Sequence, residues 1–276
     1  LGRLLTTQHH HSTLLSWSGS MFEYLMPLLV MPTFKHTLLD QTYETVVQRQ
    51  IEYGDEHGVP WGISESGYNT TDVHLNYQYR AFGVPGLGFK RELAEDLVIA
   101  PYASMMSLMV APAEACANLE RMKEEGYEGR FGFYEAVDFT PQRLATGQTS
   151  ATVRSFMAHH QGMSFLSLVY CLLDRKMQKR FQSDRLFQAT ELLLHERVPK
   201  EAIYFPHTPE GSGVQRLAGD DAPALRVIDT PDTFRPEVHL LSNGRYHVMI
   251  TSAGGGYSRW KEVAITRWRE DGCTTK

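Results

Sequence analysis

The sequence is poor in cysteine, in basic clusters and in long apolar runs. Its three cysteines, Cys116, Cys171 and Cys273, are odd in number and widely spaced, which argues against a disulfide framework and against a zinc site. The longest apolar run, Leu25 to Met31, contains Pro27 and is far too short to span a membrane. With a formal net charge of -5 and no run of Lys or Arg, the chain is not expected to bind nucleic acid.

Signatures of cofactor binding are also missing. The chain has no phosphate loop, no dinucleotide-binding fingerprint, no CxxC pair and no Ser-His-Asp order. The glycines from Gly254 to Gly256 lack the following helix and lysine that would make a phosphate cradle. Neither His9 to His11 nor His159-His160 has metal-ligand spacing. We therefore expect no cofactor and no metal, and a neutral polar substrate suits the mild charge.

What the chain does contain, up to Pro199, is helical periodicity. Between Lys35 and Gly58 apolar residues recur at three- and four-residue steps, and Gly58 is a natural stop. Further helices are predicted from Pro101, over Pro112–Glu125, over Thr149–Leu173 and over Met177–Arg197. The connections Pro60–Leu97 and Tyr127–Gln148 are longer than helix packing needs and are predicted to be loops. The predicted fold class is mainly α, with helical hairpins whose loops gather at one end.

The pattern changes after Pro199. Residues 1–198 are predicted to form the helical domain, and residues 199–236, which are rich in Pro and Gly, a linker. From residue 237 to residue 276 apolar and polar residues alternate as in β-strands, and Asn243-Gly244 is a strong hairpin signal. A few strands alone would leave open sheet edges and a thin core.

Three acids in the predicted loops are candidates for chemistry. Glu65 lies between Trp61-Gly62 and Gly67-Tyr68, and it is either a functional acid, a helix cap or an arginine partner. Glu135 is favoured as a catalytic acid or base, although a capping acid is the alternative. If its turn is helical, Asp138 shares its face and is the predicted orienting partner.

Other polar residues and several aromatic rings are candidates for substrate binding. Glu23 lies in an apolar segment, so its carboxylate needs hydrogen-bond or ion-pair partners, which are either sugar hydroxyls or Arg80. One of the two adjacent histidines is predicted to reach the site, and His159 is the one we favour. Rings that stack on the apolar faces of sugars are predicted among Trp17, Trp61, Tyr68, Tyr77, Tyr79 and Tyr134.

Six segments, in the same order, resemble the glucoamylase-like middle domain of bacterial cyclic β-1,2-glucan synthases. They are S-W-S-G-S-M-F-E-Y-L-M-P (16–27), W-G-I-S-E-S-G-Y-N (61–69), N-Y-Q-Y-R-A-F-G-V-P-G-L-G (76–88), V-I-A-P-Y-A-S-M (98–105), G-F-Y-E-A-V-D-F-T (132–140) and R-S-F-M-A-H-H-Q-G-M-S (154–164). In addition, residues 236–258 resemble the opening of the adjoining glycoside-phosphorylase β-sandwich.

The resemblance implies a six-hairpin α/α barrel, of which this chain supplies a part, followed by the first strands of the sandwich. It implies transglycosylation that cyclises β-1,2-glucan, with Glu65 and Glu135 as the carboxylate pair. The implied partners are β-1,2-glucan chains and the remaining domains of a parent synthase, which is expected in the bacterial inner membrane while this segment is soluble. The alternatives are a non-catalytic glucan-binding module and an inactive, truncated piece with exposed apolar helix faces.

Overall fold

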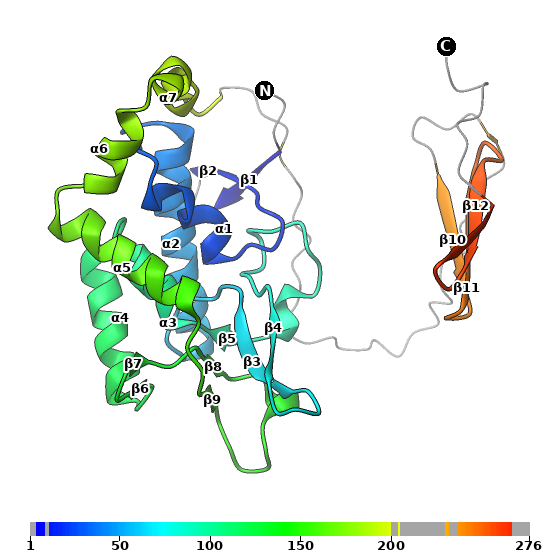
Figure 1. Ribbon diagram of the computed structural model, residues 1–276, viewed down its shortest axis with the longest axis horizontal. Coiled ribbons are helices and arrows are strands. Elements are labelled where there is room, and N and C mark those ends of the chain that lie inside the picture. Colours follow the sequence, from blue (N-terminus) through cyan, green and yellow to red (C-terminus); the bar gives the residue numbers. More distant parts are fainter. Residues whose placement is uncertain (1–3, 9–10, 200–203, 205–229, 232–236, 267–276) are drawn as a thin grey trace. The chain divides into compact units, whose positions relative to one another are not determined.

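The computed structural model describes residues 4–8, 11–199, 204, 230–231 and 237–266. The chain divides into two compact units, Leu1–Val214 and Gln215–Lys276, which Figure 1 draws in sequence colours. The predicted linker, residues 199–236, lies almost wholly outside the described residues.

The described part of the first unit contains seven α-helices. They are α1 (Met21–Leu25), α2 (Leu38–His57), α3 (Pro101–Ser107), α4 (Pro112–Glu124), α5 (Ala158–Leu172), α6 (Lys176–Gln182) and α7 (Arg185–Thr190). The same part of the chain also contains the 3-10 turns η1 (Pro27–Leu29), η2 (Leu93–Glu95), η3 (Pro141–Arg143) and η4 (Glu191–His195). The helical character predicted for this part of the chain is confirmed.

Local capping explains where the longest helix begins and ends. The Thr37 side chain accepts a hydrogen bond from the Asp40 N–H and so satisfies one of the free donors at the start of α2. At the other end, Gly58 adopts a left-handed conformation with φ 68°, which costs glycine nothing sterically. The helix predicted between Lys35 and Gly58 is thus confirmed.

Two other helix predictions need correction. Within Thr149–Leu173, residues Ala151–Val153 form strand β9, and α5 starts at Ala158. The predicted Met177–Arg197 helix is broken near Asp184, whose side chain accepts from the N–H groups of Leu186 and Phe187 and caps a new helix. A capping aspartate competes with continuation of the preceding helix, so the segment becomes α6, α7 and η4.

The predicted long loops contain strands, and this is the main correction to the fold. The strands of the first unit are β1 (Leu5–Gln8), β2 (His11–Leu14), β3 (Ser66–Thr71), β4 (Tyr77–Arg80), β5 (Val98–Ile99), β6 (Glu128–Gly129), β7 (Gly132–Phe133), β8 (Ala136–Asp138) and β9. They pair as β1-β2, β3-β4, β5-β8-β9 and β6-β7. In Figure 1 the sheets from β3 to β9 gather at one end of the helices. Most of these strands have only two to four residues, and β5 pairs with β8 from about 40 positions away, so local periodicity carries little sign of them.

The core of the first unit joins α2, α1, α3 and α5 to the small sheets. Its fully buried side chains include Val46, Ile63, Phe82, Ile99 and Met106. Because β5 and β8 are buried on both faces, they hold the loops that precede them against the helices. The end of the helical layer is therefore a rigid support for the residues discussed below.

The second unit is a four-stranded antiparallel meander. Its strands are β10 (Val238–Ser242), β11 (Tyr246–Thr251), β12 (Gly256–Trp260) and β13 (Val263–Thr266), in that spatial order. The turn predicted at Asn243-Gly244 lies between β10 and β11, with Gly244 at φ 82°. Several large apolar side chains of this sheet are exposed, among them Leu240 at 71%.

Candidate functional site

Glu65 lies directly before β3, at the edge where that strand meets the helices. It is half-buried, and its backbone carbonyl accepts a hydrogen bond of 2.9 Å from the Tyr102 hydroxyl. Burial raises the pKa of its carboxyl group, and the negative charge of Glu23 raises this pKa further. The charge of His160 and a hydrogen bond from Tyr79 act in the opposite direction. Glu65 is therefore a partly accessible acid whose pKa lies above its ordinary value.

Glu135 lies directly before β8 and is only 3% exposed. Its Oε1 accepts a hydrogen bond of 3.1 Å from the Gly67 N–H, and its Oε2 lies 3.0 Å from His160 Nδ1. A Cβ at position 67 would meet Glu135 Cγ at 3.3 Å, tighter than most such contacts, so glycine there allows the carboxylate to approach the backbone. Both carboxylate oxygens are thereby used inside the protein.

His160 connects the two acids. Its ring stacks on Tyr102 with centroids 3.7 Å apart, and its Nε2 lies 3.2 Å from the Tyr79 hydroxyl. The polar contacts run from Glu135 through His160 to the Tyr79 hydroxyl, and both Tyr79 and His160 lower the pKa of Glu65, which places Glu65 beside them. The register of β3 and β4, which pairs Gly67 with Tyr79, brings these contacts together.

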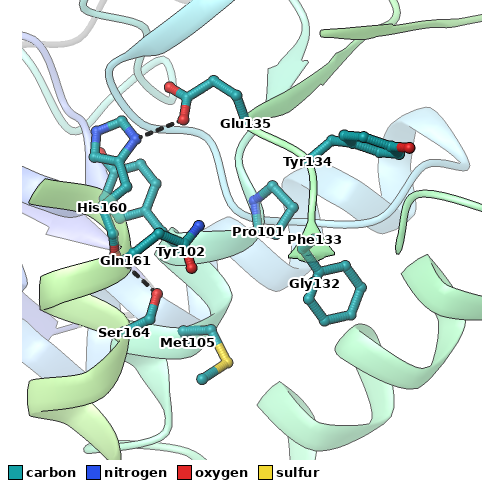
Figure 2. A pocket seen from close by; sticks show the side chains of 10 residues that line it. All are labelled: Pro101, Tyr102, Met105, Gly132, Phe133, Tyr134, Glu135, His160, Gln161 and Ser164. Atoms are coloured by element: carbon teal, nitrogen blue, oxygen red, sulfur yellow. Dashed lines mark hydrogen bonds and ion pairs between the residues drawn. The ribbon is translucent and has the colours of Figure 1, made fainter. Parts of the chain in front are cut away.

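A cavity lies beside this chain of contacts, and Figure 2 shows its lining. Glu135 and His160 line one side of it, while Phe133 and Tyr134 line another. Met105 and Ser164 complete the wall. The mixture of rings, a carboxylate and hydroxyl groups is typical of a site for a small polar ligand.

Sequence reasoning favoured His159, whereas the structure gives the central contacts to its neighbour. His159 is exposed, with its Nε2 at 3.5 Å from the Tyr79 hydroxyl. Burial and the nearby His160 lower the pKa of His159. His160 and Tyr102 were missed as site residues, although both occur in motifs that carry the family resemblance. Adjacent helical positions face different directions, and periodicity alone did not decide between them.

Asp138 does not orient Glu135, which is a correction to the prediction. The turn expected to be helical is strand β8, in which residues 135 and 138 project to opposite faces. Asp138 is fully buried and accepts hydrogen bonds from the N–H groups of Asn69 and Thr140 and from Arg143. It therefore anchors β3 to the 3-10 turn η3, and His160 takes the place beside Glu135 that was expected for Asp138.

Trp61 is a core residue, so the prediction that it stacks on a sugar is wrong. It is 5% exposed, and Asn118 and Ser104 hydrogen-bond to its backbone at 2.8 to 3.1 Å. Its ring was a fair candidate because glycines flank it, but a large apolar side chain next to α2 is buried there instead. Tyr68 is half-buried, with the guanidinium of Arg143 5.0 Å from its ring centre.

The predicted pairing of Glu23 with Arg80 is not formed. The Glu23 carboxylate accepts hydrogen bonds from Ser18, at 2.9 Å from the N–H and 2.7 Å from the hydroxyl. Arg80 pairs with Asp96 at 3.1 Å instead. Glu23 is half-buried and close enough to Glu65 to act on its pKa, which keeps it among the residues around the site.

Three of the predicted stacking rings are accessible. Trp17 is 70% exposed, Tyr79 is 41% exposed and Tyr134 is half-buried at the cavity. The sixth candidate, Tyr77, is half-buried and packs against the core. Of these accessible rings, Tyr79 and Tyr134 lie beside the carboxylates.

Comparison with known families assigns each part of the chain to a carbohydrate-active family. The chain belongs to the family described as "Putative glucoamylase", which it matches over residues 3–184. Residues 221–275 match the supersandwich domain of glycosyl hydrolase 94. The division of the chain between two carbohydrate-active families follows its division into two units.

A relative and two solved structures extend the comparison. The chain is 44% identical over 272 residues to the cyclic β-(1,2)-glucan synthase NdvB of Rhizobium meliloti (strain 1021), which confirms the resemblance stated above. This match covers 98% of the chain but 10% of NdvB. An endo-β-1,2-glucanase from Chitinophaga pinensis is similar over 70% of the chain and 46% of its own, with 17% identity and TM-score 0.49. A β-1,2-glucanase from Parabacteroides distasonis covers 69% of the chain and 26% of its own, with 18% identity and TM-score 0.45.

Neither a membrane-spanning helix nor a metal-binding cluster is found among the described residues. Within the described ranges, no helix combines the length and apolar character that crossing a bilayer requires. Among the side chains that the structure describes, no group of three or more His, Cys, Asp and Glu is arranged to hold a metal ion.

Proposed function

We propose that the first unit acts on β-1,2-glucan as a transglycosylase that cyclises the chain, with Glu65 and Glu135 as its carboxylate pair. The match to NdvB, a cyclic β-(1,2)-glucan synthase, supports the substrate class. The observation that carries the proposal is the cluster in which Glu135 contacts His160, His160 contacts Tyr79, and both His160 and Tyr79 act on the pKa of Glu65. It joins two acids that come from loops 70 positions apart in the sequence.

The two acids have different surroundings, as glycoside chemistry requires. Glu65, half-buried and with a raised pKa, is assigned as the proton donor to the glycosidic oxygen, because a raised pKa suits a general acid. Glu135 lines the cavity as the second carboxylate, held by the Gly67 N–H and His160. Tyr79, exposed beside Glu65, offers a ring face to a sugar.

The wider setting follows from the same comparisons. We propose that the helices of the first unit belong to an α/α barrel, and that the second unit belongs to a phosphorylase-type β-sandwich. The partners are the other domains of a bacterial parent synthase, which is located in the inner membrane. The substrate is a neutral glucan, consistent with the net charge of -5.

The experiment compares Glu65→Gln and Glu135→Gln with wild type, using linear β-1,2-glucan and mass spectrometry of the cyclic products. Both variants are expected to lose cyclisation while still binding linear glucan in calorimetry. Glu124→Gln, an exposed glutamate on α4, is the matched control and is expected to retain activity. Retained cyclisation in folded Glu65→Gln would overturn the proposal. Glucan binding by wild type without any product would make the unit a binding module.

A further inference from the structure

Three aromatic rings stand next to the cavity but outside the chain of contacts between the carboxylates. Phe131 and Phe156 lie with ring centroids 6.2 Å apart in an edge-to-face arrangement, and Tyr134 lies 5.6 Å from Phe156. Phe131 is 74% exposed and Phe156 is 42% exposed. We propose that these three rings, called the aromatic cluster below, form a second glucan subsite that holds a sugar away from the reacting bond. This inference rests on the proposed function.

The backbone places the aromatic cluster beside the acids. The Glu135 N–H donates to the Ser155 carbonyl at 3.0 Å, so residues 134–135 run beside residues 155–156. Tyr134 and Glu135, being neighbours in an extended segment, project in different directions, as Figure 2 shows. The cavity is lined by both residues. A glucan chain that occupies the cavity therefore runs from Glu135 toward the rings.

The turn between β6 and β7 exposes the outermost ring. Gly132 has φ 97°, a conformation that side chains rarely adopt, and this turn carries Phe131 away from the core. Exposing a phenylalanine forgoes the stabilisation that burial would provide. The exposed face of Phe131, unlike a lone surface ring, lies next to Phe156 and Tyr134, so the three rings together offer a surface to a ligand.

Arginines complete the chemistry of the aromatic cluster. The guanidinium of Arg130 lies 5.4 Å from the Phe131 ring centre, and that of Arg154 lies 5.8 Å from the Tyr134 ring centre. Ring faces suit the apolar faces of glucose, and guanidinium N–H groups donate to sugar hydroxyls. The arginines alone could also bind an anionic polymer. The rings beside them favour a neutral sugar, whose apolar faces stack on aromatic rings.

The experiment measures binding of two linear β-1,2-glucans, one short and one long, to the 276-residue chain by calorimetry. In the double variant Phe131→Ala/Phe156→Ala, the dissociation constant for the long glucan is expected to rise roughly tenfold, a loss equivalent to 1.4 kcal/mol. The short glucan, which reaches only the carboxylates, is expected to bind as in wild type. Phe165→Ala removes an equally exposed ring from α5 and is expected to change neither constant.

Equal affinity of the double variant and wild type for the long glucan would overturn the subsite. So would an equal loss for both lengths, or stronger binding of an anionic polymer that salt abolishes. As an independent readout, Phe131→Trp places a fluorophore on the exposed turn, and its emission is expected to change with the long glucan only. If Glu65→Gln abolishes cyclisation while these tests fail, the subsite falls and the proposed function stands.

Discussion

Replacement of Glu135 by alanine tests the buried contact that supports the site. The substitution leaves two groups without their partner, the Gly67 N–H and His160 Nδ1. The Glu135 and His160 side chains are each 1% exposed, so water does not readily replace the lost carboxylate. Each buried polar group left unsatisfied costs about 1–3 kcal/mol. Removing one partner of a buried pair costs about 3–5 kcal/mol, and we expect a loss of unfolding free energy in that range.

The assay is thermal unfolding of the 276-residue chain followed by circular dichroism. For a unit the size of Leu1–Val214, about 3–5 kcal/mol corresponds to a fall in Tm of roughly 6–20 °C. Glu135→Gln is the matched comparison because its amide keeps an oxygen for the Gly67 N–H. Its NH2 group is accommodated if His160 shifts its proton to Nε2, which then donates to Tyr79. We expect a loss of about 1 kcal/mol for Glu135→Gln.

The two variants together separate structure from chemistry. A Tm of the alanine variant within the error of wild type would refute the reasoning, because the carboxylate would then be solvated rather than paired with His160. Equal destabilisation by Gln and Ala would show that the negative charge, not the hydrogen bonds, stabilises this region. A stable Glu135→Gln protein that lacks cyclisation is the expected outcome.

Three further predictions concern the acids, the packing and the ligand. The charge of Glu23 raises the pKa of Glu65, whereas the Tyr79 hydroxyl lowers it. Glu23→Gln should therefore move the alkaline limb of the pH profile of cyclisation to lower pH, and Tyr79→Phe should move it to higher pH. Shifts in the same direction in the two pH profiles would contradict this. Gly83→Ala should lower the unfolding free energy by about 3 kcal/mol, since its Cβ would lie 1.7 Å from the Ser18 carbonyl oxygen; an unchanged denaturation midpoint would exclude the clash. Glucan affinity measured at low and high salt should be nearly constant, because no charge is neutralised, and a steep decline would point to an anionic ligand.

Much of the architecture follows from local signals in the sequence. The hydroxyl of Thr37 and the free backbone of Gly58 define α2 because capping depends on residues within one helical turn. The alternation after residue 237 and the Asn243-Gly244 turn likewise identify the strands of the second unit. The motifs around Glu65 and Glu135 are continuous in sequence, so the family resemblance and the two candidate acids could be identified from the sequence alone.

Only the tertiary structure decided which partners those residues have. Trp61 is buried in the core, and Asp138 pairs with Arg143. His160, 25 positions from Glu135, became the partner of the buried carboxylate. Such contacts depend on how β3, β8 and α5 meet, and a one-residue change of register or helical phase would turn a side chain to the other face. Periodicity predicts which face of an element is apolar, whereas the partner of a buried polar group is fixed only when distant elements pack together.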